Sequence, residues 1–182
     1  KMERDLKIEQ EVTNGMNIAL IEHQFVMYYQ PKYDIFTNKT NGAEALVRWF
    51  HPIKGIMPPK DFIPIFEKNG FILKLDYYVW ETVCKQLRDW IDTGKTPFPI
   101  SVNVSRVNLY NPNLVESLIG LTQKYDLPTS LLELELTESA YTDNPDVMIE
   151  VIKRLQDLGF TILMDDFGSG YSSLNMLKDI DA

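Results

Sequence analysis

The sequence predicts an α/β fold in which strands and helices alternate along the chain. Three apolar runs, at 99–104, 131–136 and 160–165, follow one another at similar intervals, with a helical pattern in each interval. This spacing is typical of βαβ units, which form parallel sheets with right-handed crossovers. A strand of an open, doubly wound sheet is buried on both faces and reads apolar throughout, whereas two of these runs have one polar face. We therefore expect a TIM-like (β/α) barrel, with the doubly wound sheet as the alternative.

The first part of the chain predicts a helix followed by two antiparallel strands. Residues 2–24 have a helical pattern, charged at first and then apolar, which we expect to be interrupted at Gly15. We interpret residues 1–24 as a linker helix from an upstream domain, with a plain N-terminal helix as the alternative. Aromatic and β-branched residues predict a strand over 25–33. A hairpin loop with several turn residues then leads to the returning strand, at 43–50.

The later helices each have one apolar face and lie between the strands. Glycine follows two of them, and proline lies in the first turn of two others. The expected helices are at 59–69, at 73–93, from the N-cap Asn111 to before Pro128, from Asn144 to Gly159, and at 172–177.

The composition limits the classes of function. The chain has 182 residues and a formal net charge of −8, which argues against a protein that binds a nucleic acid polymer by neutralising its phosphates. A lone cysteine, Cys84, is expected to be a buried structural residue. No apolar run reaches the roughly 20 residues of a membrane span, and the first residues do not resemble a signal peptide. We expect a cytoplasmic segment without membrane contact, in a parent protein that could still carry a membrane anchor.

Oxygen-bearing side chains lie on the polar faces of the expected strands. Asn103, Glu135, Asp165 and Asp166 lie at or near carboxyl ends, and Glu44 shares one face of the strand at 43–50 with Arg48. In a barrel these ends meet at one mouth. Each residue alone is typical of a solvated face, a turn or a backbone hydrogen bond. Together they favour a metal site, because a divalent cation relieves the repulsion between buried carboxylates.

The ligand chemistry favours a hard cation such as Mg²⁺ or Mn²⁺ over Zn²⁺, because the set contains neither His nor Cys. Asp165 and Asp166 reach one site only if the strand ends there, and Gly168 and Gly170 permit such a bend. A two-metal site polarises a phosphoryl group and lowers the pKa of a water nucleophile. The alternative chemistry, proton abstraction beside a carbonyl, needs a Lys or His base, which these strand ends lack.

Five short motifs follow one another along the chain: Tyr28–Pro31, Glu44–Trp49, Ser101–Ser105, Glu135–Ser139 and Asp165–Leu174. In this order they resemble the EAL domain, a family of bacterial phosphodiesterases of cyclic di-GMP. The resemblance extends from about Leu20 onward. It implies a barrel whose first strand is antiparallel to the others, and hydrolysis of cyclic di-GMP to linear pGpG with Mg²⁺ or Mn²⁺.

The resemblance also implies a role for each site residue. The implied ligands of the first metal are Glu44, Asn103, Glu135 and Asp165, and those of the second are Asp165 and Asp166. Glu44, Asp165 and Asp166 are thereby the catalytic set. Arg48 is implied to contact a substrate phosphate and Gln30 to line the nucleotide pocket. Glu138 is implied to anchor the loop at 167–173, through which we expect a homodimer.

The sequence departs from the family pattern in three places. Lys32 stands where an apolar residue is more usual, and Ser169 replaces the common Thr. The family also has a later Lys-Ile-Asp strand, whose Lys orients the attacking water, followed by a Glu that completes the second metal site and a Gln near the substrate. The sequence ends at Ala182 before that strand. We expect residues 25–182 to form a C-terminally incomplete barrel with only the first five or so strands, which by itself has little or no activity.

Three classes of function remain in view. The first is a metal-dependent cyclic di-GMP phosphodiesterase, preceded in the parent protein by a sensor or cyclase-type domain. The second is a catalytically silent module that binds cyclic di-GMP or mediates regulatory dimerisation, and the third is a purely structural interaction domain. The filled ligand positions favour the enzyme. Turnover by the complete gene product identifies the first class, and tight binding without hydrolysis identifies the second.

Overall fold

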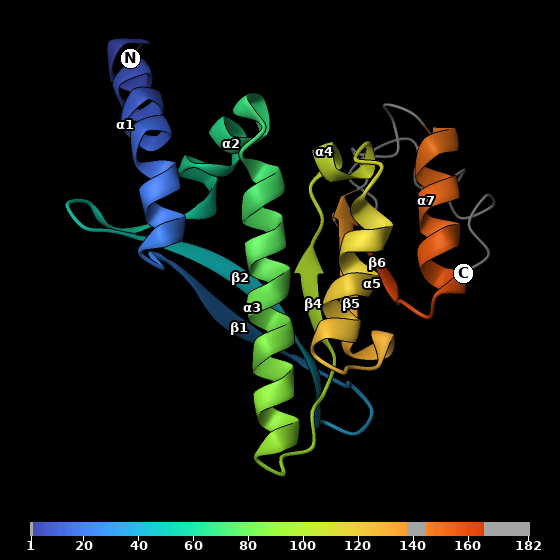
Figure 1. Ribbon diagram of the computed structural model, residues 1–182. Coiled ribbons are helices and arrows are strands. Elements are labelled where there is room, and N and C mark those ends of the chain that lie inside the picture. Colours follow the sequence, from blue (N-terminus) through green and yellow to red (C-terminus); the bar gives the residue numbers. More distant parts are fainter. Residues whose placement is uncertain (1, 138–144, 166–182) are drawn as a thin grey trace.

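The computed structural model describes residues 2–137 and 145–165, which form one six-stranded sheet with helices against it (Figure 1). The path of the sheet is β1-β2-β4-β5-β6, and β3 pairs with β2. β1 and β3 run antiparallel to β2, whereas β4, β5 and β6 continue the sheet in parallel. The strands are β1 (Phe25–Tyr33), β2 (Thr40–His51), β3 (Gly55–Met57), β4 (Ile100–Asn103), β5 (Leu132–Thr137) and β6 (Ile162–Asp165).

The helices follow the predicted alternation with the strands. Figure 1 shows α3, α5 and α7 side by side over one face of the sheet. None of the helices in the described ranges combines the length and the apolar character needed to cross a bilayer. The helices are α1 (Met2–Ile21), η1 (Pro59–Asp61), α2 (Ile63–Asn69), α3 (Ile72–Asp92), α4 (Arg106–Leu109), α5 (Leu114–Lys124), η2 (Thr129–Leu131) and α7 (Pro145–Asp157).

The two faces of the sheet differ in burial, as the sequence predicts for a barrel. On the face under the helices, Ile100, Val102 and Leu134 are fully buried. On the opposite face, β1 exposes Tyr28 and Gln30, whereas Tyr29 between them is partly buried. Side chains of a strand point alternately to either face, so the helices cover one set and leave the polar set on the open face. The antiparallel first strand and the parallel continuation confirm the predicted topology.

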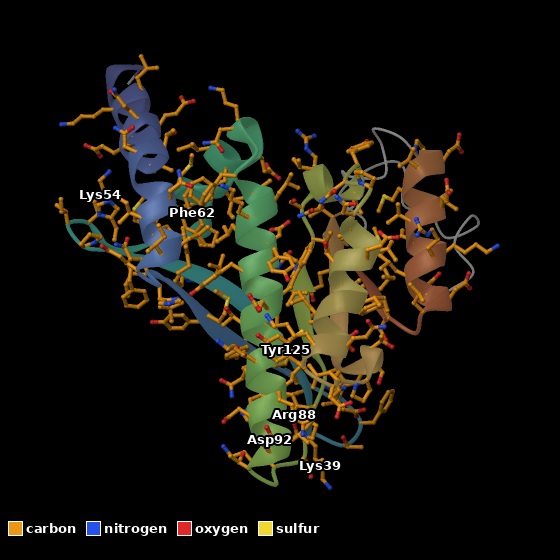
Figure 2. The ribbon with its side chains drawn as sticks, in the orientation of Figure 1. Lys39, Lys54, Phe62, Arg88, Asp92 and Tyr125 are labelled. Carbon is orange, nitrogen blue, oxygen red and sulfur yellow. The ribbon has the colours of Figure 1, made fainter. Side chains whose placement is uncertain are left out.

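The N-terminal helix passes through Gly15 without the predicted interruption. Its glycine lies against the indole of Trp49, and a Cβ there would lie 3.3 Å from Trp49 Cζ2. Trp49 is fully buried among Phe25, Phe62 and other rings, and Figure 2 shows Phe62 in this region between α1 and α2. The glycine therefore serves a close helix-to-strand approach instead of a helix break.

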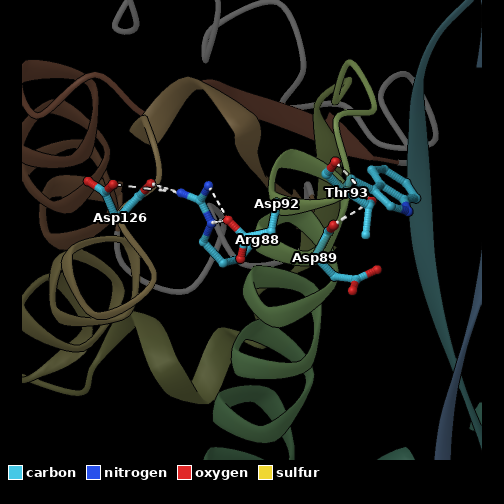
Figure 3. Close-up of polar contacts among 6 residues, drawn as sticks. Arg88, Asp89, Asp92, Thr93 and Asp126 are labelled. Carbon is cyan, nitrogen blue, oxygen red and sulfur yellow. Dashed lines mark hydrogen bonds and ion pairs between the residues drawn. The ribbon is translucent and has the colours of Figure 1, made fainter.

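The long helix α3 ends where polar side chains satisfy its last turn (Figure 3). The Thr93 hydroxyl donates to the carbonyl of Asp89 at 2.7 Å. Arg88 pairs with Asp92 at 2.7 Å and donates to the carbonyl of Asp126 at 3.1 Å. These contacts join the end of α3 to the segment that follows α5.

The structure corrects several boundaries. β2 begins at Thr40 instead of residue 43, and two short elements, β3 and α4, were not predicted. Asn111 does not cap α5. Its Oδ1 accepts a hydrogen bond from the Asn113 backbone at 3.1 Å, so it closes a local turn, and the helix starts at Leu114. Cys84 is buried as predicted, and burial raises the pKa of its thiol to about 12. The helix predicted over 172–177 lies outside the described residues.

Candidate functional site

The strand register brings four predicted site residues to one face of the sheet. Gln30 is the Cα partner of Glu44, and Glu44 is the partner of Ser101. Asn103, two residues after Ser101, is the partner of Glu135. Because paired residues in neighbouring strands point to the same side and residues two apart share a face, Gln30, Glu44, Asn103 and Glu135 form a staggered row of polar positions on one face. Asn103 and Glu135 lie one pleat repeat beyond Glu44. This is the open face, opposite the helices.

The structure describes the other predicted site residues only in part. Glu135 pairs with Leu163 of β6, and the backbone of Asp165 follows two residues later, as the partner of Thr137. Its register position therefore continues the row into β6. The remaining assignments stay predictions, because they rest on parts of the chain outside the described residues: the Asp165 side chain, Asp166, Glu138 and the loop at 167–173.

The carboxylate of Glu135 forms an ion pair with a lysine. Lys32 Nζ donates to Glu135 Oε1 at 2.8 Å and lies 3.7 Å from Glu133 Oε2. The Glu135 side chain is 9% exposed, against 32% for Lys32. A buried carboxylate needs such a partner because desolvation penalises an isolated charge. The sequence reasoning noted Lys32 only as a departure, although its spacing of two from Gln30 places it on the same face.

Arg48 is held over an aromatic ring on this face. Its guanidinium carbon lies 5.8 Å from the centre of the Tyr28 ring, and Nη1 donates to the Val47 carbonyl at 2.8 Å. Tyr28 in turn stacks on Phe50, with ring planes inclined by 13°. A cation over an aromatic face is attracted by the ring quadrupole. Arg48 shares a face with Glu44, four residues earlier, and its contact with a substrate phosphate stays a prediction.

Helix α3 fixes the backbone around Asn103 from the other side of the sheet. Trp80 Nε1 donates to the Asn103 carbonyl at 3.2 Å. One turn earlier, Asp76 Oδ2 accepts hydrogen bonds from the Ser105 backbone at 3.1 Å and from Asn108 Nδ2 at 2.6 Å. Burial raises the pKa of Asp76 to about 6, while these hydrogen bonds oppose the shift. The sequence reasoning missed Asp76, whose signal was a carboxylate among the buried positions of an amphipathic helix.

A cavity of about 530 Å³ opens beside Asn103, between the middle of β2, the end of β4 and the helices α2 and α3. Its walls combine apolar side chains such as Leu46 and Ile63 with the polar groups Asn103 and Asp76. Sites for small molecules are commonly clefts of about 300–1,000 Å³ with few polar groups. The cavity is therefore of the size and character of a ligand site next to the polar row.

The described part of the donor set fits a hard divalent cation. Glu44, Asn103 and Glu135 supply two carboxylates and one amide, all of them oxygen donors. Glu135 already holds a cation, the Lys32 ammonium, at 2.8 Å. Within the described side chains, no three Asp, Glu, His or Cys residues lie close enough together to hold a metal ion. The cage predicted from the sequence also includes Asp165 and Asp166, whose side chains lie outside the described residues.

Known proteins share both the sequence and the fold. The EAL domain model matches residues 14–182. Over 94% of the present chain, the sequence is 36% identical to the bifunctional diguanylate cyclase/cyclic di-GMP phosphodiesterase MucR of Pseudomonas aeruginosa. Over 96% of the present chain, it is 36% identical to the cyclic di-GMP phosphodiesterase NbdA of the same organism. The solved PaMucR phosphodiesterase in complex with c-di-GMP superposes with a TM-score of 0.88 at 36% identity.

The match covers different shares of these proteins. The chain spans 25% of MucR and 22% of NbdA, about a quarter of each relative, and 70% of the chain in the solved PaMucR structure. The family match begins inside α1, and the division of the chain at residues 24 and 25 stays a prediction. The TIM-like fold predicted from the motifs is confirmed. With the family model matching most of its residues, the chain belongs to the EAL domain family.

Proposed function

We propose that the protein containing this chain hydrolyses cyclic di-GMP to linear pGpG with Mg²⁺ or Mn²⁺. The observation that carries the proposal is the register that aligns Gln30, Glu44, Asn103 and Glu135 on the open face of the sheet. A purely structural interaction domain gives no reason for this row of oxygen donors. The relatives named as cyclic di-GMP phosphodiesterases support the choice of substrate.

The proposal assigns tasks to the residues of the row and to Arg48. Glu44, Asn103 and Glu135 would hold the cations together with Asp165 and Asp166. Cations held there would supply Lewis-acid chemistry, which polarises a phosphoryl group and lowers the pKa of a water nucleophile. Arg48, oriented by its ring contact with Tyr28, offers a planar fork of N–H donors to a substrate phosphate. Gln30 would line the pocket of the nucleotide.

The regulation of the parent protein is part of the same proposal. We infer a homodimer through the loop at 167–173, anchored by Glu138, and an upstream sensor or cyclase-type domain in a cytoplasmic arrangement. MucR, which is named as a bifunctional cyclase and phosphodiesterase, supports the upstream domain. Sedimentation of the full-length protein and of a Glu138→Ala variant tests the dimer. An unchanged association constant in the variant would contradict the role of Glu138.

The activity is tested on the full-length protein with cyclic di-GMP and saturating Mg²⁺ or Mn²⁺, with chromatography of the products. Wild-type protein should form pGpG, and Glu44→Gln should lower kcat by about a hundredfold or more, because it removes one charged ligand. Glu116→Gln, which removes the same charge from an exposed position of α5, is the matched control and should keep wild-type turnover.

Two outcomes separate the alternatives. Folded wild-type protein that forms no product at saturating metal would contradict the enzyme. Tight binding of cyclic di-GMP without hydrolysis would identify the silent binding module. The expectation that residues 1–182 alone turn over little cyclic di-GMP stays a prediction, and the same assay on this segment tests it.

A further inference from the structure

Lys32 reaches across the open face of the sheet from β1 to two carboxylates of β5. Its Nζ lies 2.8 Å from Glu135 Oε1 and 3.7 Å from Glu133 Oε2. Glu133 and Glu135 are two residues apart on one strand, so both carboxylates face the same side. Lys32 and Glu135 are 103 positions apart in the sequence. The ammonium therefore lies between two acceptors of the same strand and is closer to the more buried one.

The two carboxylates differ in the role that the proposed function gives them. Glu135 is a proposed metal ligand, whereas Glu133 lies one pleat repeat earlier, as the partner of Ser101. A lysine ammonium has three rotatable donors on a flexible stem. It can exchange one carboxylate for the other with a small movement of Nζ. A divalent cation on Glu135 would repel an ammonium held at the same oxygen.

We propose that Lys32 is an internal counter-cation of the metal cage. It neutralises Glu135 while the cage holds no metal, and it passes to Glu133 when Glu135 ligates a cation. The inference rests on the proposed metal-dependent function and deepens it. Lys32 acts as a positioning residue, since it reaches the cage through Glu135, and it sets the metal affinity by competing with the metal for that carboxylate.

The proposal predicts opposite effects for the two partners of the exchange. Lys32→Met removes the competitor, so the affinity for Mn²⁺ should rise, by about threefold to tenfold for a partly buried ion pair. Glu133→Gln removes the second acceptor and leaves the lysine on Glu135, so the affinity should fall by a similar factor. A merely structural ion-pair network would weaken metal binding in both variants, because both would loosen β5.

The experiment titrates full-length protein with Mn²⁺ in the absence of cyclic di-GMP, by calorimetry and by the electron paramagnetic resonance signal of free Mn²⁺. Glu135→Ala identifies the part of the titration that belongs to the cage. Lys32→Arg keeps the charge and should bind Mn²⁺ within about twofold of wild type. Lys68→Gln is the matched control, because it removes the same charge from a surface pair with Glu9 at 2.6 Å.

Thermal melts with and without Mn²⁺ report on folding. Lys32→Met should melt lower than wild type without metal and should gain more from added Mn²⁺. The inference is overturned if Lys32→Met binds Mn²⁺ no tighter than Lys68→Gln, or if Lys32→Met and Glu133→Gln shift the affinity in the same direction. If wild type and Glu135→Ala gave the same Mn²⁺ titration, Glu135 would not be a metal ligand. That result would contradict the proposed metal site as well as the role of Lys32.

Discussion

Trp80 on the outer helix α3 holds the carbonyl of Asn103, the last residue of β4, through a 3.2 Å hydrogen bond from its indole nitrogen. The bond joins the helical layer to the strand end that carries a proposed metal ligand. Trp80 is almost fully buried, so its donor needs this acceptor. The position of Asn103 is thereby set by packing on the face opposite the site.

Trp80→Phe tests this relationship. The variant keeps a ring but loses the donor, so the Asn103 carbonyl loses this hydrogen bond and the packing of α3 on β4 is weakened. We expect the free energy of unfolding to fall by about 1–3 kcal/mol and the affinity for Mn²⁺ to fall with it. Chemical denaturation and Mn²⁺ calorimetry measure the two effects. Trp90→Phe, near the far end of the same helix against Phe98, is the control. Equal losses of metal affinity in both variants would contradict a specific role for Trp80.

Asp76 predicts a pH dependence of stability of unusual sign for a carboxylate. Burial raises its pKa from 3.8 to about 6 in the folded protein. Between these values the folded state keeps the proton while the unfolded state has released it. Raising the pH through this window therefore lowers the free energy of unfolding, by up to about 3 kcal/mol. The stabilising contribution of the protonated Asp76 is fully present below pH 4 and is lost by about pH 6–7.

The comparison of wild type with Asp76→Asn isolates this group. Asp76 Oδ2 accepts both hydrogen bonds, from the Ser105 backbone and from Asn108 Nδ2. An asparagine with its carbonyl oxygen at that position can accept both and cannot ionise. The free energy of unfolding of wild type relative to Asp76→Asn, measured by urea denaturation from pH 4 to 7, should fall as the pH rises through this window. Asp89→Asn, at an exposed carboxylate of the same helix, controls for the loss of one charge from α3. A flat difference for Asp76→Asn would show that burial does not shift this group.

Tyr28 is predicted to contribute to substrate binding through Arg48. Without the ring, the guanidinium loses the contact that orients it 5.8 Å from the ring centre. Tyr28→Leu should raise KM for cyclic di-GMP by about threefold to tenfold. A cation–π contact contributes about 0.5–2 kcal/mol, depending on how far it is desolvated. Tyr28→Phe should retain wild-type KM. Tyr33→Leu, further along the same strand, is the control, and a loss equal to that of Tyr28→Leu would point to a general weakening of β1.

The sequence predicted what depends on local periodicity. Alternation within single strands was sufficient to select Glu44, Asn103 and Glu135, because the face of a strand follows from its period of two. It was not sufficient for Lys32, whose partner lies 103 residues away, since no local pattern says which strand faces a given side chain. The same holds for Asp76, whose acceptor role depends on how α3 crosses the end of β4.

Gly15 shows how a local interpretation fails when tertiary packing decides. A glycine within a helix is destabilising relative to alanine, which is why a break was predicted. In the structure the glycine permits the contact with Trp49. The indole cannot yield easily, since it is fully buried and its nitrogen donates to Gln24 Oε1 at 2.9 Å. Packing therefore outweighs helix propensity at this position.

Gly15→Ala is thus predicted to destabilise the domain by about 1 kcal/mol, because a Cβ at 3.3 Å from Trp49 Cζ2 costs more than the gain in helix propensity. Gly120 in α5 provides the matched control, since a Cβ there meets no atom within 4 Å among the described residues. Gly120→Ala should stabilise by up to about 1 kcal/mol. Urea denaturation of the two variants measures both changes. If Gly15→Ala also stabilised the protein, the contact with Trp49 would not constrain α1, and the glycine would have no packing role there.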